Sequence, residues 1–164
     1  MVKAKCALHE RCPIMTDGTN ERKVIESSAG SRGITLADES FEPRPGFKRT
    51  HIILGRDDDH DAARVYWAQD PPGVVWDPQS HNCDMVISYL QGSQKVGDKW
   101  YRAGDARIVK AGTVYGPIEA GPEGSTVVII FSNADYQPIF QGAVAVEGSS
   151  PFVPFFEHVR TTDD

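Results

Sequence analysis

Residues 73–92 read GVVWDPQSHNCDMVISYLQG, and this stretch decides the fold class. The apolar run at 73–76 is followed by Asp-Pro, a dipeptide that interrupts regular structure. From residue 83 to residue 89 every second side chain is apolar, and of the three side chains between them only Val86 is not polar, which is close to the period-two pattern of a half-buried β-strand. We therefore expect strands at 73–76 and 85–91, joined by an irregular connection.

The rest of the chain has the same character as this stretch. It contains 15 valines and 11 isoleucines but only four leucines, and β-branched side chains favour strands. Further strands are expected at residues 50–54, 63–68, 106–109, 113–115 and 126–131. Turns rich in glycine and proline are expected between strands, at residues 70–73, 91–93, 96–98, 103–105 and 120–124. Short strands at regular spacing predict an all-β sandwich or barrel.

The length of 164 residues predicts one domain. Residues 1–40 are polar and weakly periodic, so we expect an N-terminal arm or an edge strand laid on the barrel. Residues 41–150 are expected to form the barrel itself. Residues 151–164 begin with an aromatic run, which we expect to pack on the barrel or on a partner subunit, because exposed apolar surface is unfavourable. These ends suggest a homodimer.

Charge and composition exclude several classes of protein. The net charge of −6 argues against nucleic acid and anionic membrane surfaces as partners. No apolar run approaches the roughly 18–20 residues that span a bilayer, and no signal peptide is recognisable. Three cysteines suit a reducing compartment, so we expect a cytoplasmic protein. The acidic cluster at residues 57–61 lacks the spacing of a calcium loop and is expected to be solvated.

Two spaced motifs resemble the motifs of the cupin family. Residues 73–92, with Gln79, His81 and Met85 between the terminal glycines, are similar to the first cupin motif. Residues 104–119, with Tyr115 near the end, are similar to the second motif. The resemblance covers about half of the chain, and it implies a small, single-domain jelly-roll barrel that is usually dimeric and has a ligand pocket inside.

The same resemblance implies a metal site that this chain has largely lost. The family usually holds its metal with two His and one Glu from the first motif and one His from the second. The corresponding residues here are Gln79, His81, Met85 and Tyr115, of which only His81 is a good ligand. We expect no tightly bound metal. If a divalent metal is present, His81 with Gln79 and Tyr115 would hold it.

Strand alternation predicts which side chains line the pocket. If His81 points inward, Gln79, Cys83, Met85, Ile87 and Tyr89 share its face, although a bulge before Met85 would reverse the order. Tyr115 should face the same interior. Further candidates for the pocket wall are Trp76 or Trp67, Tyr101, Phe131 and His51. Cys83 is expected to be a small buried residue, and we assign no role to His9, His60 or His158.

Three functions are compatible with such a pocket. The first is a metal-independent enzyme of the isomerase, cyclase or lyase type, in which His81 exchanges a proton with a small organic molecule. Tyr115 or Gln79 would then donate a hydrogen bond to a developing oxyanion. The second is a non-catalytic sensor or carrier that binds a small ligand. The third is a metal-dependent dioxygenase with an unusual site.

Overall fold

The computed structural model describes residues 24–27, 31, 33–36, 38–141 and 158–162. The described residues contain strands and turns, and none of them forms a helix, so this part of the chain has no helix able to cross a membrane. The strands are β1 (Val24–Glu26), β2 (Lys48–Ile53), β3 (Arg64–Asp70), β4 (Val74–Trp76), β5 (Gln79–Ser80), β6 (Met85–Val96), β7 (Lys99–Arg102), β8 (Ala106–Val109), β9 (Ile118–Phe131), β10 (Ile139–Phe140) and β11 (Val159–Thr161).

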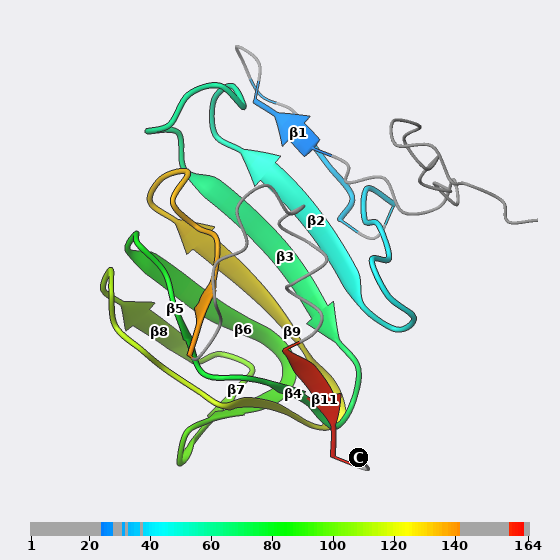
Figure 1. Ribbon diagram of the computed structural model, residues 1–164. Coiled ribbons are helices and arrows are strands. Elements are labelled where there is room, and N and C mark those ends of the chain that lie inside the picture. Colours follow the sequence, from blue (N-terminus) through cyan, green and yellow to red (C-terminus); the bar gives the residue numbers. More distant parts are fainter. Residues whose placement is uncertain (1–23, 28–30, 32, 37, 142–157, 163–164) are drawn as a thin grey trace, which may run out of the picture.

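Most of these strands belong to one nine-stranded, strongly curved sheet. The long strands β6 and β9 pair antiparallel at its centre. On one side of this pair β9 contacts β3, which leads through β2 to β1 at the edge, and on the other side β6 contacts β7 and β8. Figure 1 shows this order, with the short β5–β10 pair apart from the main sheet. The fold is the expected all-β jelly roll, and its curled sheet forms a half-barrel.

The two ends of the described chain complete the sheet. β1 pairs in parallel with β2, and β11 pairs antiparallel with β4. These short strands would be unstable in isolation, because each depends on its neighbour for backbone hydrogen bonds. The aromatic run expected to pack at residues 151–156 lies outside the described residues.

Two predicted breaks proved wrong, because the chain continues through them as strand. The glycine at the expected turn 91–93 lies inside β6, and the expected turn 120–124 lies inside β9. Opposite each other, these segments form a bulge, where the register shifts between Gly92 and Gln94. A bulge bends a strand without ending it, and here it accompanies the change of partner of β9 from β4 to β3.

Two further differences concern short strands. Residues 99–102 form β7, a strand that the sequence did not predict, between turns at 96–98 and 103–105 that it did. Residues 113–115 are not a strand, and only Tyr115 makes a bridge, to Gln79. That single bridge is nevertheless important, because it holds both residues at the cavity described below.

The alternation of side chains along β6 is confirmed. Cys83, Met85, Ile87 and Tyr89 are each at most 3% exposed, and the residues between them are more exposed. The inward residues pack with Phe131 and other residues of β9 in the main core. A second cluster surrounds Trp76, on β4 and the start of β9, and the ring of Tyr115 packs against both clusters.

The outer face of the sheet also carries apolar side chains. Val86 lies directly between Ile108 on β8 and Ile130 on β9, and the row continues through Val65 on β3 to Ile52 on β2. Ile108 is 75% exposed and Ile130 is 43% exposed. We call these five residues the outer aliphatic row.

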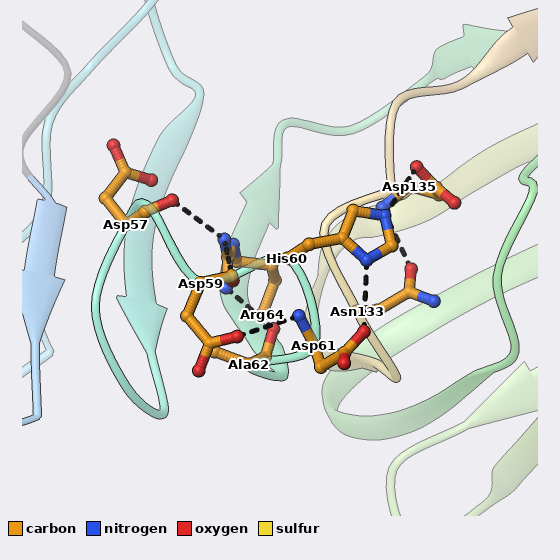
Figure 2. Close-up of polar contacts among 8 residues, drawn as sticks. All are labelled: Asp57, Asp59, His60, Asp61, Ala62, Arg64, Asn133 and Asp135. Atoms are coloured by element: carbon orange, nitrogen blue, oxygen red, sulfur yellow. Dashed lines mark hydrogen bonds and ion pairs between the residues drawn. The ribbon is translucent and has the colours of Figure 1, made fainter.

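The acidic connection between β2 and β3 is organised around a buried arginine (Figure 2). Arg64 is only 2% exposed, and its guanidinium donates hydrogen bonds to the carbonyl oxygens of Ala62, Asp57 and Asp59 at 2.6, 3.2 and 3.0 Å. The carboxylates of the loop remain at the surface, as expected for a solvated loop. The backbone of the loop is thus fixed from below by one side chain.

The histidine of this loop links it to the loop that follows β9. The ring nitrogens of His60 lie 3.1 Å from a carboxylate oxygen of Asp61 and 3.2 Å from one of Asp135 (Figure 2). These hydrogen bonds raise the pKa of His60, that to Asp61 most. These contacts are exposed to solvent, so they connect the two loops but contribute little to the stability of the fold.

Candidate active site in the barrel interior

The curved inner face encloses a cavity of about 120 Å³. On the same measure one water molecule needs roughly 10–15 Å³, so the cavity has room for a small organic ligand. The strands β3, β6, β8 and β9 supply one side of its wall, and β5 with the segment before β10 supplies the other. Its apolar wall includes Tyr66, Ala68, Trp76, Ile87, Ile118, Val127, Ile129, Phe131, Tyr136 and Pro138.

Three polar residues form a hydrogen-bonded chain on this wall. Nδ1 of His81 lies 2.6 Å from the carbonyl oxygen of Tyr136, and Nε2 lies 2.9 Å from the hydroxyl of Tyr115. A carbonyl oxygen can only accept, so Nδ1 carries the proton, Nε2 is the acceptor, and Tyr115 donates to it. The Tyr115 oxygen in turn accepts a hydrogen bond of 3.1 Å from the amide nitrogen of Gln79.

Backbone pairing holds this chain in place. The backbones of Gln79 and Tyr115 exchange both of their hydrogen bonds, each 2.9 Å long. The neighbouring residue of the same segment, His81, accepts a backbone hydrogen bond of 2.8 Å from Gly112. The two predicted motifs are therefore joined directly, one on each side of the site.

The amide oxygen of Gln79 is left as an open acceptor at the cavity. It is buried and has no hydrogen-bond partner among the described residues, while the side chain as a whole is 8% exposed. A buried polar atom without a partner is unfavourable. A ligand with a hydroxyl or amine group would satisfy it.

Burial sets the protonation states of the pair. Removal from solvent lowers the pKa of His81 to about 4, against the hydrogen bond to Tyr136, and the nearby charge of Arg107 lowers it further. Burial also raises the pKa of Tyr115 to about 12, which Arg107 opposes. At neutral pH both groups are uncharged, so in the ligand-free protein His81 is a weaker base than its ordinary pKa of 6.5 would make it.

An arginine that the sequence analysis missed lies beside this pair. Arg107 projects from β8, opposite Ile87, and its guanidinium carbon lies 4.4 Å from the ring centre of Tyr115 and 5.7 Å from that of Tyr101. It forms no ion pair with any carboxylate of the described residues. The alternation of β8 could have revealed it, since Val109, two residues later, is buried.

A second arginine at the cavity is fully neutralised. Arg49 donates to a carboxylate oxygen of Asp70 at 2.6 Å and to the carbonyl oxygen of Gln69 at 2.8 Å. The other oxygen of Asp70 accepts from Trp76 at 3.2 Å and from Gln94 at 3.4 Å. Nothing in the motifs pointed to this network, because its members come from four different strands.

Six of the predicted pocket residues line the cavity, and four do not. The lining residues are Gln79, His81, Tyr115, Trp76, Ile87 and Phe131. The other four, Met85, Tyr89, Tyr101 and His51, lie behind the wall.

Three of the residues behind the wall support a lining residue. The sulfur of Met85 lies 3.9 Å from the Tyr115 hydroxyl, and His51 stacks on Tyr66 with ring centres 4.3 Å apart. Tyr101 lies beneath Arg107, and Tyr89 stacks on Tyr101. Trp67, the alternative to Trp76, is also absent from the wall.

The side chains at the site do not suit a divalent metal. Both nitrogens of His81 are engaged, one by a carbonyl oxygen and the other by a hydroxyl. Met85 offers a thioether, and Tyr115 is held protonated. Among the residues that the structure describes, no group of three His, Cys, Asp or Glu side chains could hold an ion. We therefore derive no chemistry from a metal here.

Comparison with known proteins identifies the fold alone. No protein-family model matches the chain, and no curated protein matches its sequence. An RmlC-like cupin protein from Ralstonia eutropha JMP134 aligns over 63% of this chain and 67% of its own, with 16% identity and a TM-score of 0.50. Oxalate decarboxylase from Lactobacillus farciminis aligns over 70% of this chain, with 16% identity and a TM-score of 0.54.

The matched structures differ in length. The alignment covers 38% of the Lactobacillus farciminis enzyme and 34% of a Bacillus subtilis oxalate decarboxylase, so the chain spans little more than a third of these proteins. KdgF from Halomonas sp. is covered over 97% of its length, with 21% identity and a TM-score of 0.49.

Proposed function

Since this chain has the cupin fold, we propose that it is an enzyme that binds a small organic molecule inside the barrel and moves a proton on it. The observation that carries the proposal is the hydrogen-bonded chain of Gln79, Tyr115 and His81 at the cavity. Isomerisation, cyclisation or elimination next to a carbonyl group are the reactions that these groups support.

In the proposed step, Tyr115 and His81 act as one proton-transfer unit. A C–H group next to the ligand's carbonyl gives its proton to the Tyr115 oxygen, while the Tyr115 hydrogen moves to Nε2 of His81. The step forms an enolate and an imidazolium, so charge and protons balance. The Nδ1–H of His81 keeps its hydrogen bond to Tyr136 throughout. Return of the proton to another atom of the ligand completes an isomerisation.

The low pKa of His81 sets a condition on this step. An isolated imidazolium is unfavourable at this buried site, so it forms only together with a neighbouring negative charge. An enolate next to Tyr115 supplies that charge. Gln79 keeps the Tyr115 oxygen oriented, and its own amide oxygen accepts a hydroxyl or amine hydrogen of the ligand.

A non-catalytic binding barrel is the second candidate. The observation that favours it is again the pKa of about 4, which makes His81 a weak base in the ligand-free protein. In this case the cavity would hold a ligand without changing it. The two candidates differ in whether a product forms.

The test is a substrate screen with carbonyl compounds, read by mass spectrometry for isomers and elimination products. We expect wild-type turnover to fall by about 10²–10⁴-fold in Tyr115→Phe and in His81→Gln, because each removes one partner of the proton transfer. His60→Gln, an exposed histidine outside the cavity, is the matched control and should keep full turnover. Circular dichroism checks that the variants are folded.

Two results would contradict the proposal. Full turnover by folded Tyr115→Phe would remove the hydroxyl from the mechanism. Ligands that raise the melting temperature of the protein and yield no product across the screen would favour the binding barrel.

A further inference from the structure

The charges of the side chains that line the cavity do not sum to zero. Arg49 and Asp70 form a buried pair at 2.6 Å, which is neutral as a unit. Arg107 is the remaining charged residue of the described wall, and it has no carboxylate partner among the described residues. The cavity therefore carries one net positive charge, although the protein as a whole carries −6.

The guanidinium of Arg107 lies between two aromatic side chains. The aromatic rings of Tyr115 and Tyr101 lie against the guanidinium, and the π-electrons of such rings attract a cation. The guanidinium is within hydrogen-bonding reach of the Tyr89 hydroxyl, but its Nε is buried and has no hydrogen-bond acceptor among the described residues. A buried N–H group without an acceptor is unfavourable. An anionic ligand in the cavity would supply that acceptor.

The rest of the wall restricts what that acceptor belongs to. Most of the lining is aromatic or aliphatic, so the ligand presents apolar surface beyond its charged group. A carboxylate matches the planar fork of a guanidinium with two parallel hydrogen bonds. Arg107 is the only unneutralised cation of the described wall, which suits a ligand with a single negative charge.

We propose that the cavity binds a small organic carboxylate through Arg107. The proposal names the ligand class of the active site described above, and in that sense it rests on the proposed function. Because Arg107 covers the ring of Tyr115, the carbon atoms nearest the carboxylate lie next to the proton-transfer pair. The reacting carbon is therefore close to the carboxylate group of the ligand.

The test is a set of binding measurements with defined probes. Acetate, lactate, benzoate and phenylacetate are each compared with the corresponding neutral amide, and inorganic phosphate is measured beside them. Binding is followed by calorimetry and by the shift in melting temperature. We expect at least one carboxylate to bind about tenfold or more tightly than its amide, and more tightly than phosphate, because hydrogen bonds to charged groups are the stronger ones.

Variants assign the preference to the residue. Arg107→Gln should abolish the preference for the carboxylate over the amide, and Arg107→Lys should retain part of it, because the charge remains without the fork. Arg102→Gln, an exposed arginine on the neighbouring strand β7, removes the same charge away from the cavity and should change nothing. Thermal unfolding shows whether each variant is folded.

Three outcomes would overturn the inference. The first is that no carboxylate of the panel binds more tightly than its amide. The second is that folded Arg107→Gln still prefers the carboxylate. The third is that phosphate binds as tightly as the best carboxylate. Failure of the proposed function looks different, since carboxylates would then bind through Arg107 and remain unchanged. If the protein converts only uncharged compounds, the catalytic proposal stands and the proposal of a carboxylate ligand is wrong.

Discussion

Burial at the cavity shifts the pKa of His81 far from that of free histidine. Burial holds its folded pKa near 4, whereas an unfolded histidine has a pKa of 6.5. Above pH 6.5 the ring is neutral in both states and has no effect on stability. As the pH falls from 6.5 towards 4, the unfolded chain takes up a proton that the folded chain does not, so stability is lost.

We therefore expect His81→Gln to flatten the pH dependence of stability. Wild type should lose up to about 3 kcal/mol more than the variant between pH 6.5 and pH 4, at about 1.4 kcal/mol for each pKa unit. Urea unfolding of both proteins across this range measures the difference. Parallel curves for the two proteins would show that His81 titrates normally in the folded state.

The sequence identified the residues of the hydrogen-bonded chain but not their chemistry. Gln79, His81 and Tyr115 stand at spaced motif positions, so their proximity could be predicted. Which ring nitrogen of His81 carries the proton depends on the carbonyl oxygen of Tyr136, a residue that the motifs do not contain. The alternation of β8 places Arg107 on the inner face, but its lack of a carboxylate partner among the described residues is a property of the folded structure.

At the scale of strands, the bulge shared by β6 and β9 is the most demanding local feature. Gly92 has a φ of +66°, and a Cβ atom there would lie 2.1 Å from the carbonyl oxygen of Gly124. The carbonyl oxygen belongs to the backbone and the position of Cβ is fixed by the backbone of residue 92, so the contact cannot be relieved without shifting a central strand of the sheet.

Gly92→Ala should therefore be strongly destabilising. Gly104→Ala is the matched control, because Gly104 also has a positive φ, +94°, but no atom lies within 4 Å of its added Cβ. The control should cost about 1–2 kcal/mol from backbone strain, and Gly92→Ala should cost about 1–3 kcal/mol more from overpacking. Chemical denaturation of both variants gives the comparison. Equal losses would mean that the strands separate freely at the bulge.

This bulge also explains why strand boundaries were mispredicted. Glycine and proline at residues 91–93 and 120–124 have the local signature of turns. Whether such residues end a strand or only bend it depends on pairing with a distant strand, which a local pattern does not contain. The inward alternation of β6 was predictable, since it depends only on the period of the strand and a buried face.

At the scale of the whole molecule, the outer aliphatic row leaves apolar surface on the convex side. The row crosses strands β8, β6, β9, β3 and β2 without a charged side chain. Two copies with a net charge of −6 repel each other through their charged surfaces, and an uncharged row lets them approach. We propose that the chain forms a homodimer through this row, because in a two-fold contact the row of each copy would cover the row of the other.

Sedimentation equilibrium tests this proposal. Wild type should sediment as a dimer, and Ile108→Asp should shift the equilibrium to monomer, because it places a charge at the exposed end of the row. Ile139→Asp is the control, since Ile139 is 48% exposed but lies on β10, in the separate two-stranded sheet. A monomeric wild type, or equal effects of the two substitutions, would exclude this interface.

The position of Trp76 has a practical consequence. Of the three tryptophans, it alone lines the cavity, and its indole N–H donates to the buried carboxylate of Asp70 at 3.2 Å. Indole fluorescence responds to polarity and to nearby charge, so a ligand that enters the cavity alters the emission of this residue. The emission of Trp76 can therefore be used to determine the affinity of a ligand without a label, before any product has been identified.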